Sequence, residues 1–156
     1  AGEESKPSGT PSENTRTRTH TLGTHAGSCL CGAVAYEFDD PVVQFCYCHC
    51  PRCRKATGSA HASNIFIRPD QFRWTRGQEH VRRYDLPEAK RFAKCFCVTC
   101  GSPLPHATRA GDGVIIPAGS LDTDPGVKPQ CGIWWSARAP WYLSTAELQQ
   151  HEEGLR

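Results

Sequence analysis

The chain has 156 residues and a formal net charge of +2, which is long enough for one domain with a buried core. A charge so close to zero gives no reason to expect nucleic acid or an anionic membrane as the partner. No apolar run approaches the length of a membrane span, so we also expect no membrane association.

Residues 1–27 predict a flexible polar tail. They are rich in Thr, Ser, Gly and Pro, contain Leu22 as their one large aliphatic residue, and have no aromatic residue. Such a segment buries too little apolar surface to offset the entropy of ordering. Its Lys and Arg residues balance its Glu residues, which argues against a basic arm that binds nucleic acid. We therefore place the folded domain at residues 28–156.

Short strands separated by turns follow the tail. Val34, Tyr36 and Phe38 alternate with other residues, as on a half-buried strand. Residues 42–47 and 59–67 predict two more strands. Between them, residues 54–58 suit one short helical turn that ends at a glycine.

The second half of the chain continues the pattern. Phe72 and Trp74 share a strand face, and residues 80–85 pair with residues 91–96 across a proline-containing turn. Gly111-Asp112-Gly113 predicts a hairpin before a strand at 114–116. Residues 133–135 predict a last strand, and residues 145–153 a helix with Thr145 as its N-cap. We expect the tryptophans near the C-terminus, Trp134, Trp135 and Trp141, to serve core and lid packing together with Tyr142, the alternative being a ligand cage.

Ten cysteines are the main chemical signal, and they are clustered along the chain. A disulfide framework spreads its cysteines to join distant segments, whereas ligands of one metal ion occur as close pairs and triplets. The clustering therefore favours zinc over disulfides. It also indicates a reducing compartment, so we expect a cytoplasmic protein. The clustered residues are Cys29, Cys31, Cys48, Cys50, Cys53, Cys97 and Cys100.

Two of the clusters predict a closed structural site. Cys29-x-Cys31 and Cys97-x2-Cys100 are each followed by a glycine, which allows the backbone to turn close to an ion. Together they supply four thiolates for one tetrahedral zinc. Spacing alone also permits Cys29 and Cys31 to pair with the Cys50 and Cys53 thiolates instead.

The middle cluster predicts a different kind of site. Cys48, Cys50 and Cys53 supply three thiolates, and three protein ligands with one open position are typical of a reactive zinc. The rival interpretation is that a further residue closes the site. The candidates for this fourth ligand are Cys46, Cys95, Cys131, His49 and His61.

An open site of this kind suits a thiol. Three thiolates leave the zinc centre with a charge of about −1, so it is a modest Lewis acid that readily accepts a fourth thiolate. Arg52, Arg54 and Lys55 follow directly, and they either offset this charge and attract an anionic substrate or are ordinary surface cations.

Three cysteine motifs occur in order along the chain, and two further segments follow them. The motifs are Gly27-Ser28-Cys29-Leu30-Cys31-Gly32-Ala33-Val34, Cys48-His49-Cys50-Pro51-Arg52-Cys53-Arg54-Lys55 and Phe96-Cys97-Val98-Thr99-Cys100-Gly101, and the later segments are Pro117-Ala118-Gly119-Ser120-Leu121-Asp122 and Lys128-Pro129-Gln130. In this order they resemble the glutathione-dependent formaldehyde-activating enzyme (GFA) family, also known as the centromere protein V type domain. The resemblance extends from about Ser28 to Tyr142.

The resemblance implies a mainly β protein with a β-tent fold, in which zinc clamps antiparallel sheets and there is little helix. It implies two Zn²⁺ ions, a structural one on Cys29, Cys31, Cys97 and Cys100 and a second one on Cys48, Cys50 and Cys53, where the catalytic chemistry with glutathione takes place. The family's type enzyme is a carbon–sulfur lyase that interconverts S-(hydroxymethyl)glutathione with formaldehyde and glutathione.

The sequence therefore predicts a zinc enzyme of carbon–sulfur bond chemistry whose partners are a small-molecule thiol and an electrophile. One alternative is a binding module in which both zinc ions are structural. Another is an enzyme like the zinc-containing methionine sulfoxide reductases, which need an unligated cysteine of low pKa. The cysteines outside the predicted ligand sets are Cys46, Cys95 and Cys131.

Overall fold

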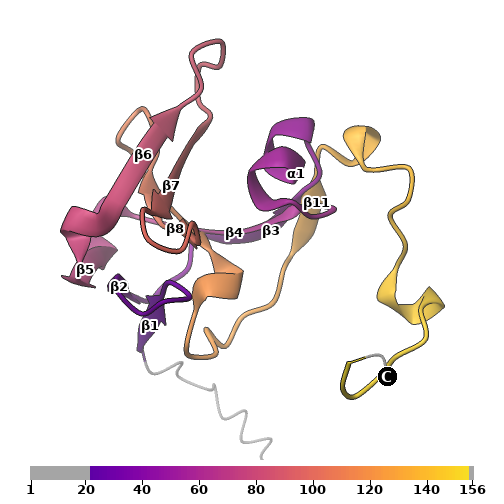
Figure 1. Ribbon diagram of the computed structural model, residues 1–156, viewed down its shortest axis with the longest axis horizontal. Coiled ribbons are helices and arrows are strands. Elements are labelled where there is room, and N and C mark those ends of the chain that lie inside the picture. The colour runs from indigo at the N-terminus through magenta and orange to yellow at the C-terminus, as the bar shows by residue number, and fades with distance from the viewer. Residues whose placement is uncertain (1–21, 155–156) are drawn as a thin grey trace, which may run out of the picture.

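The computed structural model describes residues 22–154 and is built mainly from β-strands around one short helix (Figure 1). The strands are β1 (Thr24–Ser28), β2 (Ala35–Asp39), β3 (Gln44–Cys48), β4 (Ala62–Ile67), β5 (Phe72–Arg76), β6 (Val81–Asp85), β7 (Ala93–Cys97), β8 (Pro103–Leu104), β9 (His106–Ala107), β10 (Val114–Pro117) and β11 (Cys131–Ile133). The helix α1 spans Pro51–Thr57, and 3₁₀ turns lie at Pro69–Gln71, Gln78–His80, Ala118–Ser120, Trp135–Ala137 and Thr145–Glu147. The prediction of a mainly β fold with little helix is confirmed.

The strands form three sheets, in the orders β1-β2-β5, β11-β3-β4-β10-β9 and β6-β7-β8. Neighbouring strands are antiparallel except β11, which runs parallel to β3 at one edge of the five-stranded sheet. The five-stranded sheet is therefore mixed rather than purely antiparallel. A tight turn cannot join parallel strands. The chain therefore reaches the edge beside β3 by a long connection, residues 118–130, between β10 and β11.

Alternation along β2 builds the main core. Tyr36 and Phe38 are fully buried on one face of this strand, where they meet Ile65 and Ile116 from the five-stranded sheet. A second, smaller core joins the first sheet to the β6-β7-β8 sheet, and it includes Val34 beside several of the cysteines. The two cores fix the positions of the three sheets around the cysteine clusters.

The predicted hairpins are confirmed. β6 pairs with β7 in the register that matches Val81 with Cys97 and Asp85 with Ala93. β9 pairs with β10 across the turn that contains Gly111, whose φ of 76° is in the left-handed region that favours glycine.

The folded part begins earlier than position 28. Residues 24–27 belong to β1, which pairs with β2 along its whole length. In this strand His25 is buried and its Nε2 lies 2.8 Å from a carboxylate oxygen of Asp40. Residues 1–21 of the predicted tail lie outside the described residues.

The C-terminal predictions are wrong in two respects. Residues 145–153 form no α-helix; a single 3₁₀ turn spans Thr145–Glu147, and every side chain of this segment is exposed. A segment without a buried face lacks the packing that stabilises most short helices. The last strand ends at Ile133, because Trp134 has a φ of 55°, and the chain leaves the sheet there.

The tryptophans do not pack in the core. Trp134, Trp135 and Trp141 are 65%, 50% and 64% exposed, and the segment that follows β11 runs along one side of the molecule, away from the sheets (Figure 1). Of the three, Trp135 makes edge contacts with the rings of His49 and Tyr142. Trp135, His49 and Tyr142 thus form an aromatic cluster next to β3, and not part of the hydrophobic core.

Candidate metal centres and the adjoining cavity

Four cysteines from two distant parts of the chain converge to form the first group. Cys29 and Cys31 lie in the turn after β1, while Cys97 ends β7 and Cys100 lies in the turn after it. Their four sulfur atoms all lie within 4.8 Å of one another, with separations of 3.6 Å for Cys29–Cys31 and 3.9 Å for Cys31–Cys97. A tetrahedral zinc with Zn–S bonds of about 2.3 Å places its sulfurs about 3.8 Å apart, so the spacing fits this ion.

Tight turns hold both halves of this four-cysteine group. The N–H of Gly32 donates to the Cys29 carbonyl at 3.0 Å, and the N–H of Gly101 donates to the Cys97 carbonyl at 2.8 Å. The two glycines have φ values of 80° and 73°, which explains why glycine follows each pair. The N–H of Val34 also donates to Cys29 Sγ at 3.3 Å, a contact that favours the thiolate form.

Three cysteines form the second group, at the junction of β3 and α1. Cys48 ends β3, Cys50 is the N-cap of α1, and Cys53 lies in the first turn of that helix. Their sulfurs again lie within 4.8 Å of one another, and the N–H of Cys53 donates to Cys50 Sγ at 3.3 Å. A hydrogen bond from Cys53 lowers the pKa of Cys48 to about 6, so this group readily provides a thiolate.

Within residues 22–154 no fourth ligand joins this three-cysteine group. Cys46 instead has its sulfur 2.8 Å from that of Cys131. Cys95 is buried in the smaller core, where no other sulfur of the described residues lies in hydrogen-bond range. The ring of His49 packs against Trp135, Tyr142 and His61. The ring of His61 stacks on Tyr47, with ring centres 4.0 Å apart.

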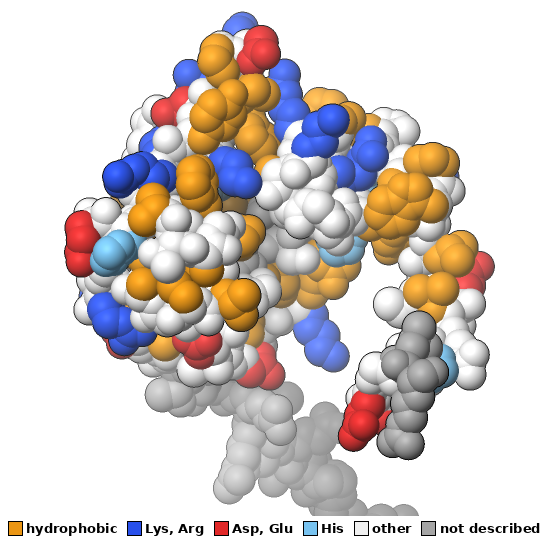
Figure 2. Space-filling view, in the orientation of Figure 1, with side chains coloured by type: hydrophobic (Ala, Val, Ile, Leu, Met, Phe, Trp, Pro, Cys, Tyr) orange, Lys and Arg blue, Asp and Glu red, His pale blue; other side chains and the backbone are white. Residues whose placement is uncertain are grey.

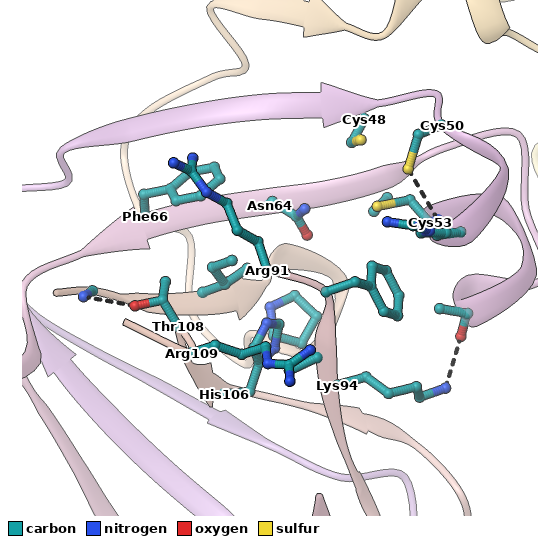
Figure 3. A pocket seen from close by; sticks show the side chains of 18 of the residues that line it. Cys48, Cys50, Cys53, Asn64, Phe66, Arg91, Lys94, His106, Thr108 and Arg109 are labelled. Atoms are coloured by element: carbon teal, nitrogen blue, oxygen red, sulfur yellow. Dashed lines mark hydrogen bonds between the residues drawn. The ribbon is translucent and has the colours of Figure 1, made fainter. Parts of the chain in front are cut away.

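The three-cysteine group opens onto a large cavity, of about 1130 Å³. All three of its cysteines line this cavity, whereas none of the four-cysteine group does. Walls are contributed by α1, β4, β7 and β10, and Figure 3 shows the sulfurs at one end of the space with Arg91 pointing toward Phe66 at the other. The cavity gives a small molecule access to the three sulfurs of this group.

Basic side chains surround the cavity, and most of them are already engaged. Lys94 Nζ donates to the Ala56 carbonyl at 3.1 Å; Arg109 donates to the Leu86 and Ala89 carbonyls; and Arg68 pairs with Asp70 at 3.1 Å. Within the described residues Arg52 and Arg91 have no hydrogen-bond or ion-pair partner. Figure 2 shows Lys and Arg side chains over α1 and over the β6–β7 hairpin on the same face.

The sequence identified part of this basic surface. Arg52 lines the cavity, whereas Arg54 and Lys55 of the same helix do not. Sequence reasoning missed Arg91, which lies in the hairpin between β6 and β7, and it missed His106 of β9. Nothing in the local sequence marks either residue, because their position at the cavity results from the packing of separate sheets.

His106 is a neutral lining residue near pH 7. Burial lowers its pKa to about 4, and the nearby positive charge of Arg83 acts in the same direction. The cavity therefore draws its positive charge from the arginines and from Lys94, not from this histidine.

Residues 24–137 match the family model described as "Glutathione-dependent formaldehyde-activating enzyme". The chain belongs to this family. The match extends from β1 to the 3₁₀ turn after β11, so it includes both cysteine groups and the cavity between the sheets. The resemblance inferred from the motifs is thus confirmed.

The GFA-family chain is also similar to a crystal structure of a protein from Rhodobacter sphaeroides. The TM-score is 0.53 at 26% sequence identity, and the similarity covers 69% of this chain and 98% of the other. A comparison with curated proteins gave no match. None of the helices in residues 22–154 has the length and apolar character needed to cross a bilayer.

The structure groups the same four and the same three cysteines that the sequence assigned to two zinc ions. Both groups could hold a metal, and the spacing of the first fits zinc closely. The assignment of each cysteine as a zinc ligand and of Arg52, Arg54 and Lys55 as substrate-binding residues remains a prediction.

Proposed function

We propose that this GFA-family protein is a zinc-dependent enzyme of carbon–sulfur bond chemistry that uses glutathione or a similar thiol. In this proposal the four-cysteine group holds a structural zinc, and Cys48, Cys50 and Cys53 hold a reactive one. The observation that carries the proposal is that the group with three sulfurs, and not the group with four, lines the large basic cavity.

Cys48, Cys50 and Cys53 would hold the ion with three sulfurs beside the cavity. A zinc ion bound here would favour the thiolate form of a co-substrate thiol at neutral pH. The N–H of Cys53 steadies the group from within by donating to Cys50 Sγ. Such outer hydrogen bonds fix the orientation of metal ligands.

The cavity binds the rest of the co-substrate. Glutathione carries two carboxylates, and Arg52 and Arg91 are the lining cations without a partner inside the described chain. An arginine can bind a carboxylate with two parallel hydrogen bonds. Arg91 points away from the three sulfurs (Figure 3), as is needed to bind a carboxylate while the thiol lies at the cysteines.

The reaction we propose is the formation or cleavage of S-(hydroxymethyl)glutathione. In the forward direction the thiolate sulfur forms a bond to the carbonyl carbon of formaldehyde, and the carbonyl oxygen takes up a proton from solvent. In reverse the hydroxyl group loses its proton to solvent, the carbonyl double bond re-forms as the carbon–sulfur bond breaks, and the sulfur leaves as a thiolate. A reducing compartment keeps ten free cysteines intact, so we place this activity in the cytoplasm.

Two of the three cysteines outside the two groups, Cys46 and Cys95, do not suit the catalytic role in a methionine sulfoxide reductase. That chemistry needs an exposed cysteine of low pKa. Burial raises the pKa of Cys46 to about 11 and also raises that of Cys95, and both side chains are buried.

Calorimetry with glutathione and S-methylglutathione tests the proposal. S-methylglutathione keeps both carboxylates but cannot form a thiolate, so it should bind much more weakly to the zinc-loaded protein. Binding of glutathione should release a proton, which buffers of different ionisation heat reveal. Equal affinity for the two ligands, or no binding of either, would favour a binding module without catalysis.

Formation of S-(hydroxymethyl)glutathione is then followed by NMR with and without the protein, because the adduct also forms unaided.

A further inference from the structure

Two cysteines outside the metal groups face each other across the edge of the five-stranded sheet. Cys46 in β3 is in register with Cys131 in β11, and their sulfur atoms are 2.8 Å apart. This is closer than the Cys29–Cys31 and Cys31–Cys97 sulfur pairs of the four-cysteine group, at 3.6 and 3.9 Å. Neighbouring strands lie about 4.8 Å apart, which falls within the Cα separation of about 4.4–6.8 Å that a disulfide needs.

No metal group competes for this pair. Seven of the ten cysteines belong to the two groups that could hold a metal. Of the remaining three, Cys95 is buried and no other sulfur lies in hydrogen-bond range of it within the described chain. Cys46 and Cys131 are thus the two non-ligand thiols that the fold brings together.

We propose that Cys46 and Cys131 form a reversible disulfide, and that a low-molecular-weight disulfide is the oxidant. This is a modification site separate from both metal groups, and it does not depend on the proposed function.

The different exposure of the two residues sets the order of the steps. Cys131 is exposed, whereas Cys46 is 1% exposed. Cys131 therefore attacks the small disulfide first, which breaks that S–S bond, releases one thiol and leaves Cys131 in a mixed disulfide. The Cys46 sulfur then attacks Cys131 Sγ, and its proton passes to the second departing thiol. Two protein thiols are oxidised and one small disulfide is reduced to two thiols, so electrons and protons balance.

The bond would fix one wall of the cavity. β11 has three residues and pairs with one strand, β3. Ile133 of this strand and Trp134 after it line the cavity beside the three-cysteine group. In addition, the N–H of His49 donates to the Ile133 carbonyl at 3.0 Å. A disulfide at Cys131, two residues before Ile133, would therefore hold this wall against β3, the strand that ends at Cys48.

The test uses the full zinc-loaded chain and glutathione disulfide as the probe. The expected product is a protein lighter by two hydrogen atoms, with one crosslink that fragmentation of the peptides places between Cys46 and Cys131. Cys95 should remain reduced, the zinc content should not change, and dithiothreitol should restore the starting mass. A crosslink between cysteines of the metal groups, a persistent mixed disulfide on wild-type Cys131, or no reaction would overturn the proposal.

Two variants separate the steps. Cys46→Ser should stop at the mixed disulfide, so that Cys131 keeps one glutathione as a stable adduct. Cys131→Ser, which changes an exposed side chain, should show no adduct and no crosslink. If Cys46→Ser does not fold, the Cys131→Ser variant and the wild-type peptide map still decide the matter. Crosslinking at the wild-type rate in Cys131→Ser would contradict the assignment.

Discussion

The Sγ atoms of Cys31 and Cys97 lie 3.9 Å apart, although 66 residues separate them in the chain. The four-cysteine group therefore joins the first sheet to the β6-β7-β8 sheet, and both Cys29 and Cys97 are buried in the smaller core between them. The three-cysteine group joins only the end of β3 to the start of α1. The two groups should respond differently to the loss of a ligand.

Cys97→Ser should leave the protein unfolded or insoluble, because a zinc that joins distant segments contributes its binding energy to folding, on the order of 10 kcal/mol in zinc-finger peptides. Cys53→Ser is the matched control, since it removes a ligand from the local group and should leave a folded protein with weaker zinc binding. Circular dichroism and thermal unfolding of both variants provide the measurement. A Cys97→Ser protein with wild-type thermal stability would contradict the structural role.

The protein purified without added metal should contain two zinc ions per chain. The ion in the three-cysteine group should leave first when a chelator is added, because this group faces the cavity and supplies one ligand fewer. Elemental analysis gives the stoichiometry, and a zinc indicator dye follows the release. One zinc per chain, iron in place of zinc, or release of both ions in a single phase would argue against two different sites.

Arg91→Gln should weaken the binding of glutathione roughly tenfold or more, since a hydrogen bond between charged groups contributes about 1.5–3 kcal/mol. Lys55→Gln removes the same charge from an exposed position outside the cavity and should change the dissociation constant little. Calorimetry on the zinc-loaded variants makes the comparison. If the two substitutions weaken binding equally, the effect comes from overall charge and Arg91 does not contact the ligand.

His106 should make the protein less stable as the pH falls from about 6.5 to 4. Its pKa is about 4 in the folded protein, against 6.5 for an ordinary histidine, so in this window the unfolded chain binds more protons, and the free energy of unfolding decreases. The full effect is on the order of 3 kcal/mol. His106→Asn, which cannot titrate, should lose less stability over the same window.

Chemical denaturation of the wild type and His106→Asn at several pH values measures this difference, and zinc release at low pH is common to both proteins. An NMR titration of His106 gives an independent check. A midpoint near 6.5 for this residue, the value of an ordinary histidine, would show that it is not buried as described.

Gly27→Ala should lower the free energy of unfolding by about 1–3 kcal/mol, the usual effect of inserting a carbon into a packed site. A Cβ at this position would overlap the ring and hydroxyl of Tyr36, which is fully buried and hydrogen-bonded to Ser120 at 2.6 Å. Gly119→Ala is the control, because no atom lies within 4 Å of a Cβ built there. Similar thermal stabilities for the two variants would show that Tyr36 can move aside.

Much of this architecture could be predicted from local sequence patterns. The alternation of Val34, Tyr36 and Phe38 indicates a buried strand face, and Gly111 indicates the hairpin before β10, because both signals arise within a few residues. The cysteine pairs and the triplet were also predictable from their close spacing. Spacing alone left open whether Cys29 and Cys31 meet Cys97 and Cys100 or Cys50 and Cys53, and the family resemblance implied the first of these groupings.

Features that depend on contacts between distant parts of the chain could not be predicted from the sequence. The approach of Cys46 to Cys131 spans 85 residues and depends on a parallel strand at the sheet edge, for which no local signal exists. Arg91 resembles any exposed arginine in a hairpin until the sheets pack around the cavity. The tryptophans suggested a core, but the left-handed backbone of Trp134 directs the chain away from the sheet.

The two cysteine groups also differ in when they can exist during protein synthesis. The three-cysteine group is complete once Cys53 has been made, when about two thirds of the 156 residues are still to come. The four-cysteine group must wait for Cys100, after β7 has formed. A nascent chain emerging from the ribosome should therefore be able to bind an ion at the three-cysteine group before the four-cysteine group is complete. A cell short of zinc would then accumulate chains whose three-cysteine group holds an ion and whose sheets are not yet joined by the four-cysteine group.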